Sequence, residues 1–508
     1  MKLAPICGRF TLIGLLLALA ACGDGGGGGS SPPLEAQVST LAYVVTRCHE
    51  EKGGAGYSGS QALWVRQGDR EPLKVAEFAM GQPPIGGLCR VLGDLRNGSL
   101  FTVIGAFQRL GVSPDGSTVV FEVSDDFSIL SHVVTADQQG IFAVRADGSG
   151  LHRVADHSND PAFHVDWACG AAPAKTCTIA TGPYPLQFSP DGRRVVLTDL
   201  GPSDTGDDAP QVFTVDLASG ARQQLTHIPP VPECRGQSDD PPDCVWPGLA
   251  SVSNLSFLDD TTVAYGIGRD GSAVGGGVFT VKLNADGTPE GEPQAVPVLA
   301  LPNGAVVPVF EITGAVAYAA IAVVPGRTPV NGSSSSVAKV FVVEPTSSAF
   351  LPGDRVLQLT NYDRWDTGGA RFATDGQHVV FRASADPLGT NPSNQCQLFS
   401  IDRLGGDRRQ LTSFAIVGDH PRNCEEGASP GCTIYGFNQV DLRTGALVFD
   451  STCDPVGTNP HDGNQLFALR PDGTGLRQLT YTQGIITHPD RSIDVELPGP
   501  FHIPSRLR

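Results

Sequence analysis

Two stretches of the chain read FRASADPLGTNPSNQCQLFSIDRLGGDRRQLT (residues 381–412) and FDSTCDPVGTNPHDGNQLFALRPDGTGLRQLT (residues 449–480). Aligned without gaps at an offset of 68 residues, they are identical at 15 of 32 positions, far more than shared composition would produce. The chain therefore contains an internal repeat, and this repeat defines a structural unit.

Each copy of the repeat divides into strands and turns. A β-branched and aromatic run, Val379–Phe381 or Leu447–Phe449, predicts a strand, and the Asp-Pro-x-Gly-Thr-Asn-Pro segment after it consists of turn-forming residues. Gln-Leu-Phe and Arg-Gln-Leu-Thr predict two more strands, and a further candidate lies upstream. Four short antiparallel strands per unit are typical of one blade of a β-propeller.

The same order of turns and strands recurs earlier in the chain. Ser-Pro-Asp-Gly occurs at 113–116 and at 189–192, each time followed by a β-branched run. This tetrapeptide suits a tight turn because Pro presets φ, Asp bonds its own backbone and Gly accepts positive φ.

These segments resemble the TolB-like propeller repeat, a relative of WD repeats found in TolB and in the non-catalytic domains of prolyl-oligopeptidase-type peptidases. The resemblance covers most of the chain after about residue 40 and implies a fold rather than a function. The residues that carry it are the Ser-Pro-Asp-Gly turns, their variant at 374–376, and the Gln-Leu-Thr endings at 224–226, 410–412 and 478–480.

We therefore expect an all-β chain in which residues 38–508 form a single propeller of four-stranded antiparallel blades. Seven blades are expected, with six or eight as alternatives because residues 257–260 and 315–318 match the pattern poorly. C-terminal residues, 493–497 or 501–503, are expected to close the ring. The count rests on pairs of third and fourth strands near 62–78, 140–154, 211–226, 277–298, 337–360, 395–412 and 465–480.

The start of the chain has the pattern of an export signal. Residues 1–21 combine Lys2 and Arg9 with a short apolar run, too short to span a bilayer comfortably. Leu19-Ala20-Ala21-Cys22 resembles a bacterial lipobox, which implies cleavage before Cys22 and lipidation of its sulfur. Residues 22–37, rich in Gly, Ser and Pro, predict a flexible tether that holds the propeller near a membrane.

Composition narrows the classes of partner. The chain carries 35 basic and 53 acidic residues, a net charge of −18; loss of Lys2 and Arg9 with the signal would leave 33 − 53 = −20. Nucleic acid and anionic lipid surfaces are therefore poor partners, and membrane contact is expected through the N-terminal lipid only. We expect a monomer.

Ten of the 12 cysteines remain once Cys7 and Cys22 are set aside, and an even number in an exported protein predicts disulfides. No pair has the spacing of zinc or redox sites. We expect the pairs Cys48–Cys89, Cys169–Cys177, Cys234–Cys244, Cys396–Cys453 and Cys424–Cys432.

The sequence offers few candidates for chemistry. It has no Gly-x-Ser-x-Gly elbow and no room for a hydrolase domain, so we assign no catalytic residue. Six histidines in or near predicted loops are candidates for a site at the central channel, if the loops bring them together. They are His132, His157, His164, His420, His461 and His488. No cofactor is expected, although Asp386, Asn391, Asn394, Asp454, Asn459 and Asp462 offer closely spaced oxygens that would suit Ca²⁺; plain turn chemistry explains the same residues.

Two functions remain open. The first is a non-enzymatic binding module in the cell envelope, whose loops or channel dock a protein, a peptide or an envelope polymer. The alternative is a propeller enzyme, of the lyase or of the lactonase or hydrolase type, with a metal-assisted site at the channel mouth. In both cases we expect an exported protein, lipid-anchored to the outer membrane facing the periplasm or to the cell surface.

Overall fold

The computed structural model describes most of one compact unit, Glu35–Arg508. The preceding unit, Met1–Leu34, lies outside the described residues, and with it the expected signal peptide, Cys22 and most of the tether. The described residues contain no helix long and apolar enough to cross a bilayer. They are 35–52, 56–80, 89, 106–124, 134–158, 186–229, 252–269, 272–296, 311–313, 317–325, 336–344, 355–362, 367–415, 424, 432–434, 439–459 and 463–504.

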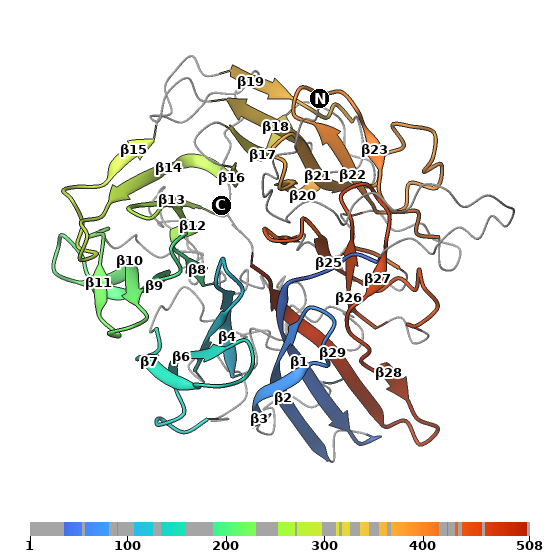
Figure 1. Ribbon diagram of the computed structural model, residues 1–508, viewed down its shortest axis with the longest axis horizontal. Coiled ribbons are helices and arrows are strands. Elements are labelled where there is room, and N and C mark those ends of the chain that lie inside the picture. The colour runs from blue at the N-terminus through green and yellow to red at the C-terminus, as the bar shows by residue number, and fades with distance from the viewer. Residues whose placement is uncertain are drawn as a thin grey trace, which may run out of the picture. The chain divides into compact units, whose positions relative to one another are not determined.

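The strands form antiparallel sheets arranged around a common centre, as in a β-propeller (Figure 1). Three of the four-stranded sheets lie between residues 107 and 296. They are β4 (Phe107–Val112), β5 (Thr118–Val123), β6 (Gly140–Arg145) and β7 (His152–Ala155); β8 (Gln187–Phe188), β9 (Arg194–Pro202), β10 (Asp208–Asp216) and β11 (Arg222–Gln224); and β12 (Val252–Asp259), β13 (Thr262–Arg269), β14 (Ser272–Lys282) and β15 (Gln294–Val296).

Three more four-stranded sheets follow in the second half of the chain. They are β16 (Glu311–Thr313), β17 (Ala317–Pro325), β18 (Ser336–Glu344) and β19 (Arg355–Gln358); β20 (Thr367–Phe372), β21 (His378–Ala383), β22 (Gln397–Asp402) and β23 (Arg409–Gln410); and β24 (Gln439–Val440), β25 (Leu447–Ser451), β26 (Gln465–Leu469) and β27 (Arg477–Gln478).

The remaining sheet has five strands and joins the two ends of this unit; we call it the closing sheet. Its order is β28 (Gly484–Thr487), β29 (Ile493–His502), β1 (Thr40–Glu50), β2 (Tyr57–Gln67) and β3 (Leu73–Met80). The pairing of β1 with β29 is the closure by C-terminal residues that the sequence predicted. The blade prediction needs a correction: the described residues form six four-stranded blades and not seven, because β28 adds a fifth strand to the closing sheet.

The Ser-Pro-Asp-Gly segments are tight turns, as predicted. In the turn between β4 and β5, Asp115 Oδ1 accepts hydrogen bonds from the Ser113 hydroxyl (2.6 Å) and the Ser117 N–H (3.0 Å). Gly116 has a φ of 71°, in the left-handed region that favours glycine. Asp191 repeats this arrangement between β8 and β9.

The Gln-Leu-Thr endings are explained by a buried pair of side chains that joins the two outer strands of a blade. The Thr480 hydroxyl donates to Gln465 Oε1 (2.8 Å) and accepts from the Leu466 N–H (2.9 Å). Gln465 also donates through Nε2 to the Thr482 carbonyl (2.9 Å). The same contacts recur for Gln211 with Thr226 and for Gln397 with Thr412. The repeat signature is therefore structural.

Apolar clusters between sheets form the core. Ala42 and Val44 of β1 pack toward Val119 and Phe121 of the β4–β7 sheet. The opposite face of β1 packs toward the β24–β27 sheet, whose contributing residues include Val448 and Leu466. Because one strand separates two clusters, the alternation of its side chains joins both neighbouring blades to the closing sheet.

The disulfides differ in part from those expected. Cys48 bonds Cys89, which is the expected pair. The structure pairs Cys396 with Cys424 and Cys432 with Cys453, and this corrects the expectation of Cys396–Cys453 and Cys424–Cys432. Cys169, Cys177, Cys234 and Cys244 lie outside the described residues.

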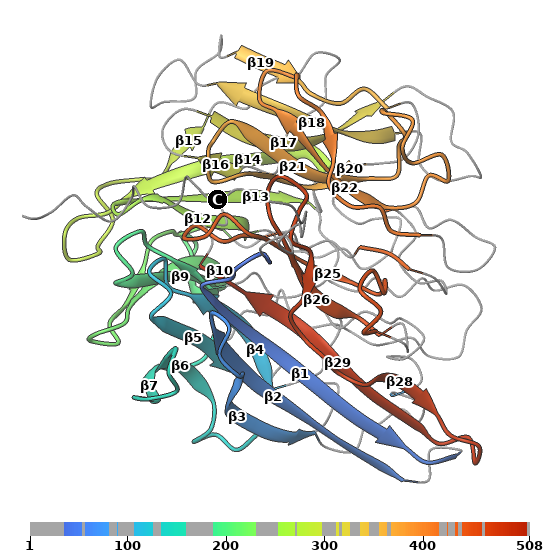
Figure 2. The ribbon, with the colours of Figure 1, turned by 45° about the vertical axis from the view of Figure 1, so that its right-hand side comes forward.

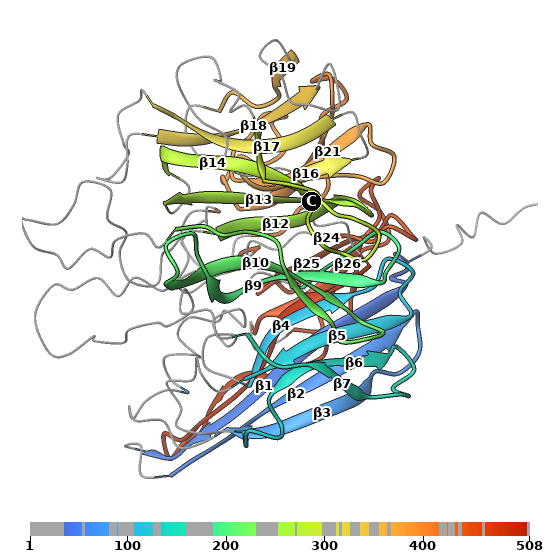
Figure 3. The ribbon, with the colours of Figure 1, turned by 90° about the vertical axis from the view of Figure 1, so that its left-hand side faces the viewer.

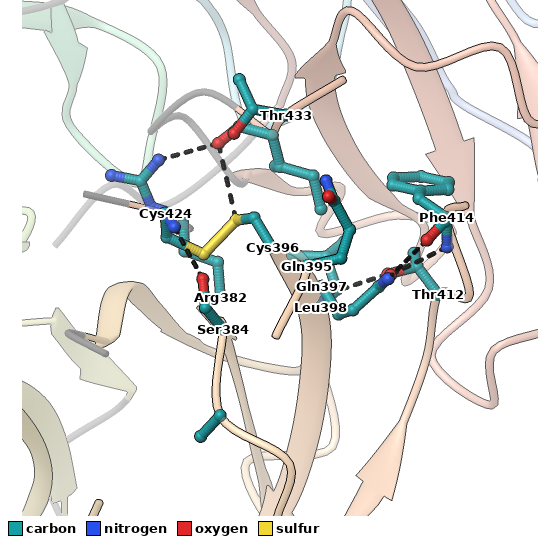
Figure 4. The surroundings of a disulfide bond; sticks show 12 residues. Arg382, Ser384, Gln395, Cys396, Gln397, Leu398, Thr412, Phe414, Cys424 and Thr433 are labelled. Atoms are coloured by element: carbon teal, nitrogen blue, oxygen red, sulfur yellow. Dashed lines mark hydrogen bonds between the residues drawn. A yellow bond between two sulfur atoms is a disulfide. The ribbon is translucent and has the colours of Figure 1, made fainter. Parts of the chain in front are cut away.

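The physical reason for the difference is that the connection between two blades is tied to both of them. Cys424 bonds Cys396 at the start of β22, and Cys432 bonds Cys453 just after β25. Around the first bridge, the Cys424 N–H donates to the Ser384 hydroxyl (2.7 Å), and Arg382 donates to the Ile434 carbonyl (2.9 Å) (Figure 4). Sequence spacing favoured local pairs and gave no signal for such a connection.

Candidate functional site

The Asp/Asn-rich loops of the repeat are held by their own hydrogen bonds. In the first copy, Asp386 Oδ1 accepts from the Asn391 N–H (2.7 Å). The buried Asn391 amide donates to the carbonyls of Ala385 (3.2 Å) and Gln395 (2.8 Å). Asn394 donates to the Ser384 carbonyl (3.0 Å). The amide groups therefore occupy carbonyl oxygens that a cation would otherwise use.

The second copy repeats the contacts of Asp386 and Asn391 at Asp454 and Asn459. Asp454 Oδ1 accepts from the N–H groups of Thr458 (2.7 Å) and Asn459 (2.8 Å), and Asn459 Nδ2 donates to the Gly463 carbonyl (2.8 Å). Asp462 lies outside the described residues. Within the residues described, no group of three or more His, Cys, Asp or Glu side chains is placed to hold a metal ion. That no cofactor binds stays a prediction, with Ca²⁺ at these loops as its alternative, and turn chemistry accounts for every contact described above.

Two of the six histidines named from the sequence lie among the described residues. His132, His164, His420 and His461 lie outside the described residues, whereas His157 follows β7 and His488 lies between β28 and β29. These two belong to different sheets. A third histidine, His49 of β1, contacts the same residue as His488, and the sequence gave no reason to select it.

His49 and His488 share one carboxylate on the closing sheet. Asp494 of β29 lies opposite His49 in the β1–β29 register. Asp494 Oδ1 is 2.6 Å from His49 Nδ1, and Asp494 Oδ2 is 2.6 Å from His488 Nε2. All three side chains are about half exposed, at 43%, 40% and 39% for His49, Asp494 and His488.

A second ionic pair lies beside this triad. Arg47 lies opposite Glu496 in the same register and bonds it at 2.7 Å, and Glu496 also accepts from the Gln483 N–H (2.8 Å). Arg47 and His49 are two residues apart, so their side chains leave the same face of β1. We call Arg47, His49, His488, Asp494 and Glu496 the closing-sheet ladder. Strands β1, β2, β28 and β29 of the closing sheet extend past the strands of neighbouring sheets (Figure 2).

The electrostatics of the triad follow from the shared carboxylate. The hydrogen bonds from His488 and His49 hold the pKa of the Asp494 carboxyl below its ordinary value, so Asp494 is ionised near neutral pH. An ionised carboxylate only accepts, so His49 donates through Nδ1 and His488 through Nε2. The second ring nitrogen of each imidazole, Nε2 of His49 and Nδ1 of His488, is turned away from this carboxylate, an arrangement that suits hydrogen bonding or proton transfer.

A buried ionic group elsewhere serves structure. Arg109 of β4 and Glu122 of β5 are 3.4 Å apart, with only 3% and 1% of their side chains exposed. Arg109 also donates to the Thr198 carbonyl and hydroxyl, both at 3.0 Å. These contacts join the β4–β7 and β8–β11 sheets and leave no exposed polar surface for a ligand.

Sequence comparison does not place the chain in a family: no family model and no curated protein matches it. Solved structures with a similar arrangement include an oligogalacturonate lyase from Vibrio parahaemolyticus, at 8% identity over 91% of this chain and 98% of that one, with a TM-score of 0.43. An α-L-arabinofuranosidase from Fusarium graminearum is 12% identical over 72% of this chain and 92% of that one, with a TM-score of 0.37.

Prolyl oligopeptidase B from Galerina marginata is 10% identical over 86% of this chain, with a TM-score of 0.41, and this chain spans about half (51%) of its length. By their names, these similar structures are mostly enzymes. Likeness at this level carries no argument about what this chain does.

Proposed function

We propose that the protein is a lipid-anchored β-propeller of the cell envelope, related to the TolB-like repeat proteins, and that it binds a protein, a peptide or an envelope polymer. One observation carries the proposal: Arg47, His49, His488 and Asp494 of the closing-sheet ladder are about half exposed, whereas the polar residues of the repeat are occupied within their own loops. The ladder is thus one of the described surfaces where charged side chains can be reached by a ligand, and it is the one that holds two histidines on a shared carboxylate.

The ladder suits recognition for two reasons. Arg47 offers a planar donor, and the imidazoles of His49 and His488 offer a lone pair beside a fixed carboxylate. Arg47, His49 and Asp494 stand on paired strands, and His488 stands in the short turn that joins β28 to β29, so little conformational freedom is lost when a ligand binds.

The test is binding of purified peptidoglycan, and crosslinking to envelope proteins, by the wild-type chain and by Arg47→Ala and Asp494→Asn variants. We expect each substitution to weaken binding about tenfold, the effect of losing one charge-assisted hydrogen bond. Lys74→Ala is the matched control, because Lys74 forms an exposed ion pair with Glu77 (2.5 Å) on the same sheet but outside the ladder. Equal binding by all four proteins would rule out the ladder as the binding surface.

The proposed anchor is tested separately. A Cys22→Ser variant is expected to leave the membrane fraction, because no acyl chain can be attached to a hydroxyl in this position by the lipoprotein pathway that the Leu19–Cys22 segment resembles. Membrane association that survives this substitution would contradict a lipid anchor at this residue.

A second function is favoured by the triad of His49, Asp494 and His488. A carboxylate that fixes the tautomers of two imidazoles is an arrangement for acid–base chemistry, and the names of the similar structures agree better with an enzyme than with a binding module. Turnover of an acidic polysaccharide or a lactone that falls at least a hundredfold in both His49→Gln and His488→Gln would establish this reading. Turnover that persists in both variants would exclude the triad as its site.

A further inference from the structure

Strand β28 ends the closing sheet on one side. It pairs with β29 over Gly484–Thr487, and no other described strand pairs with it. In Figures 1 and 2 it lies at the outer end of the sheet. A closed ring removes the free edges of its inner strands, and β28 creates a new edge outside that closure.

The hydrogen-bond pattern of the hairpin shows which backbone groups face this edge. The His488 N–H donates to the Ser492 carbonyl (3.0 Å), so residues 488 and 492 form a hydrogen-bonded pair. Bonded and non-bonded pairs alternate in an antiparallel ladder. Gly484 and Ile486 therefore bond β29, whereas the N–H and C=O groups of Ile485 and Thr487 point away from it.

The β28 edge lacks the charges that several other sheet edges carry. The edge strand β3 carries the exposed ion pair of Lys74 with Glu77, and the outer strands β11 and β23 carry Arg222 and Arg409. The sequence of β28 is Gly-Ile-Ile-Thr, and both isoleucines are only partly buried. An uncharged edge with outward N–H and C=O groups is a template for another strand.

We propose that β28 binds an extended, basic segment of a partner protein, which adds to the closing sheet as a sixth strand. Charge selects this occupant. The chain has a net charge of −18, so it repels a second copy of itself and attracts a cationic segment. Asp490, in the turn of the hairpin that contains β28 and outside the closing-sheet ladder, offers a carboxylate to a lysine or arginine side chain of the added strand. This backbone edge is separate from the side-chain ladder and does not rest on the proposed function.

The probe is an eight-residue peptide of alternating lysine and valine, titrated into the purified full-length protein. The decisive variant is Ile485→Pro, which removes one outward N–H and leaves the bonds to β29 intact; proline is tolerated on an edge in this position. Ile485→Thr is the matched control, because it keeps the N–H. We expect at least tenfold weaker binding by Ile485→Pro and binding within twofold of wild type by Ile485→Thr.

A second measurement keeps the test decisive if Ile485→Pro does not fold. The same peptide, N-methylated at alternate residues, keeps its charge but cannot form the backbone hydrogen bonds to β28. It is expected to bind the wild-type protein at least tenfold more weakly. Equal binding of the two peptides would show attraction by charge alone and would overturn the proposal. A wild-type dimer that dissociates in Ile485→Pro would also overturn it, by making a second copy the occupant.

Discussion

The burial of His502 leads us to expect that acid weakens the closure of the ring. This histidine of β29 is 1% exposed and lies opposite Ala42 of β1. Its Nδ1 accepts the N–H of Val112 at 3.1 Å, so the neutral imidazole is the form that fits. A second proton would have to sit on Nδ1, and the bond to Val112, which ties β29 to the β4–β7 sheet, would be lost.

The size of this loss of stability follows from the pKa of His502. Burial lowers the pKa of His502 from 6.5 to about 4. At about 1.4 kcal/mol per pKa unit, this difference amounts to about 3 kcal/mol. The unfolded chain takes up the proton near pH 6.5 and the folded chain does not, so the contribution is complete above pH 6.5 and is lost as the pH falls toward 4.

The assay is urea unfolding at several pH values between 7 and 4, for the wild type and for His502→Asn. The Asn side chain offers an oxygen near the place of Nδ1 and does not titrate in this range. We expect the free energy of unfolding of the wild type to fall by about 3 kcal/mol more than that of the variant. Asp494, at the other end of β29, has a lowered pKa and titrates below this window. Parallel losses in the two proteins would refute the argument.

Three further predictions concern stability and covalent structure. Asn459→Ala is expected to destabilise the fold by about 2–3 kcal/mol, measured by urea unfolding, because it leaves buried carbonyls without donors; Val456→Ala, at an exposed position of the same loop, is its control and should change little. Thr480→Val should cost about 1–3 kcal/mol by breaking the contact with Gln465, and an unchanged unfolding midpoint would count against that contact. Peptide mapping without reduction should recover Cys432 linked to Cys453. Replacing both with Ser should lower the free energy of unfolding by about 3 kcal/mol, because the bridge closes a loop of 21 residues. Recovery of Cys424 linked to Cys432 would contradict the structure.

Much of the fold could be predicted because its signals are local. Ser-Pro-Asp-Gly, Gln-Leu-Phe and Gln-Leu-Thr each encode a turn or a strand pair within a few residues, and the structure places strands at each of the third-and-fourth-strand positions used to count blades. The extra strand β28 escaped prediction because Gly-Ile-Ile-Thr is short and carries no repeat signature.

The candidate site could not be predicted, because its residues become neighbours only through ring closure. His49 and Asp494 are 445 residues apart in sequence, and nothing in either local segment marks the other as a partner. The repeat loops, by contrast, were easy to select from the sequence but form no site among the described residues. Asp386 and Asn391 stood out in the sequence, yet their contacts are those of a turn.

The position of β29 between β28 and β1 also constrains how the molecule can assemble. Arg47 and Glu496 are separated by 449 residues, so the pairing of β1 with β29 forms only after nearly the whole chain has been synthesised. Contacts so distant along the chain slow folding, and until they form, β1 presents an open border along its whole length. A product truncated before β29 would keep this unpaired edge permanently, which exposes it to proteases and to aggregation.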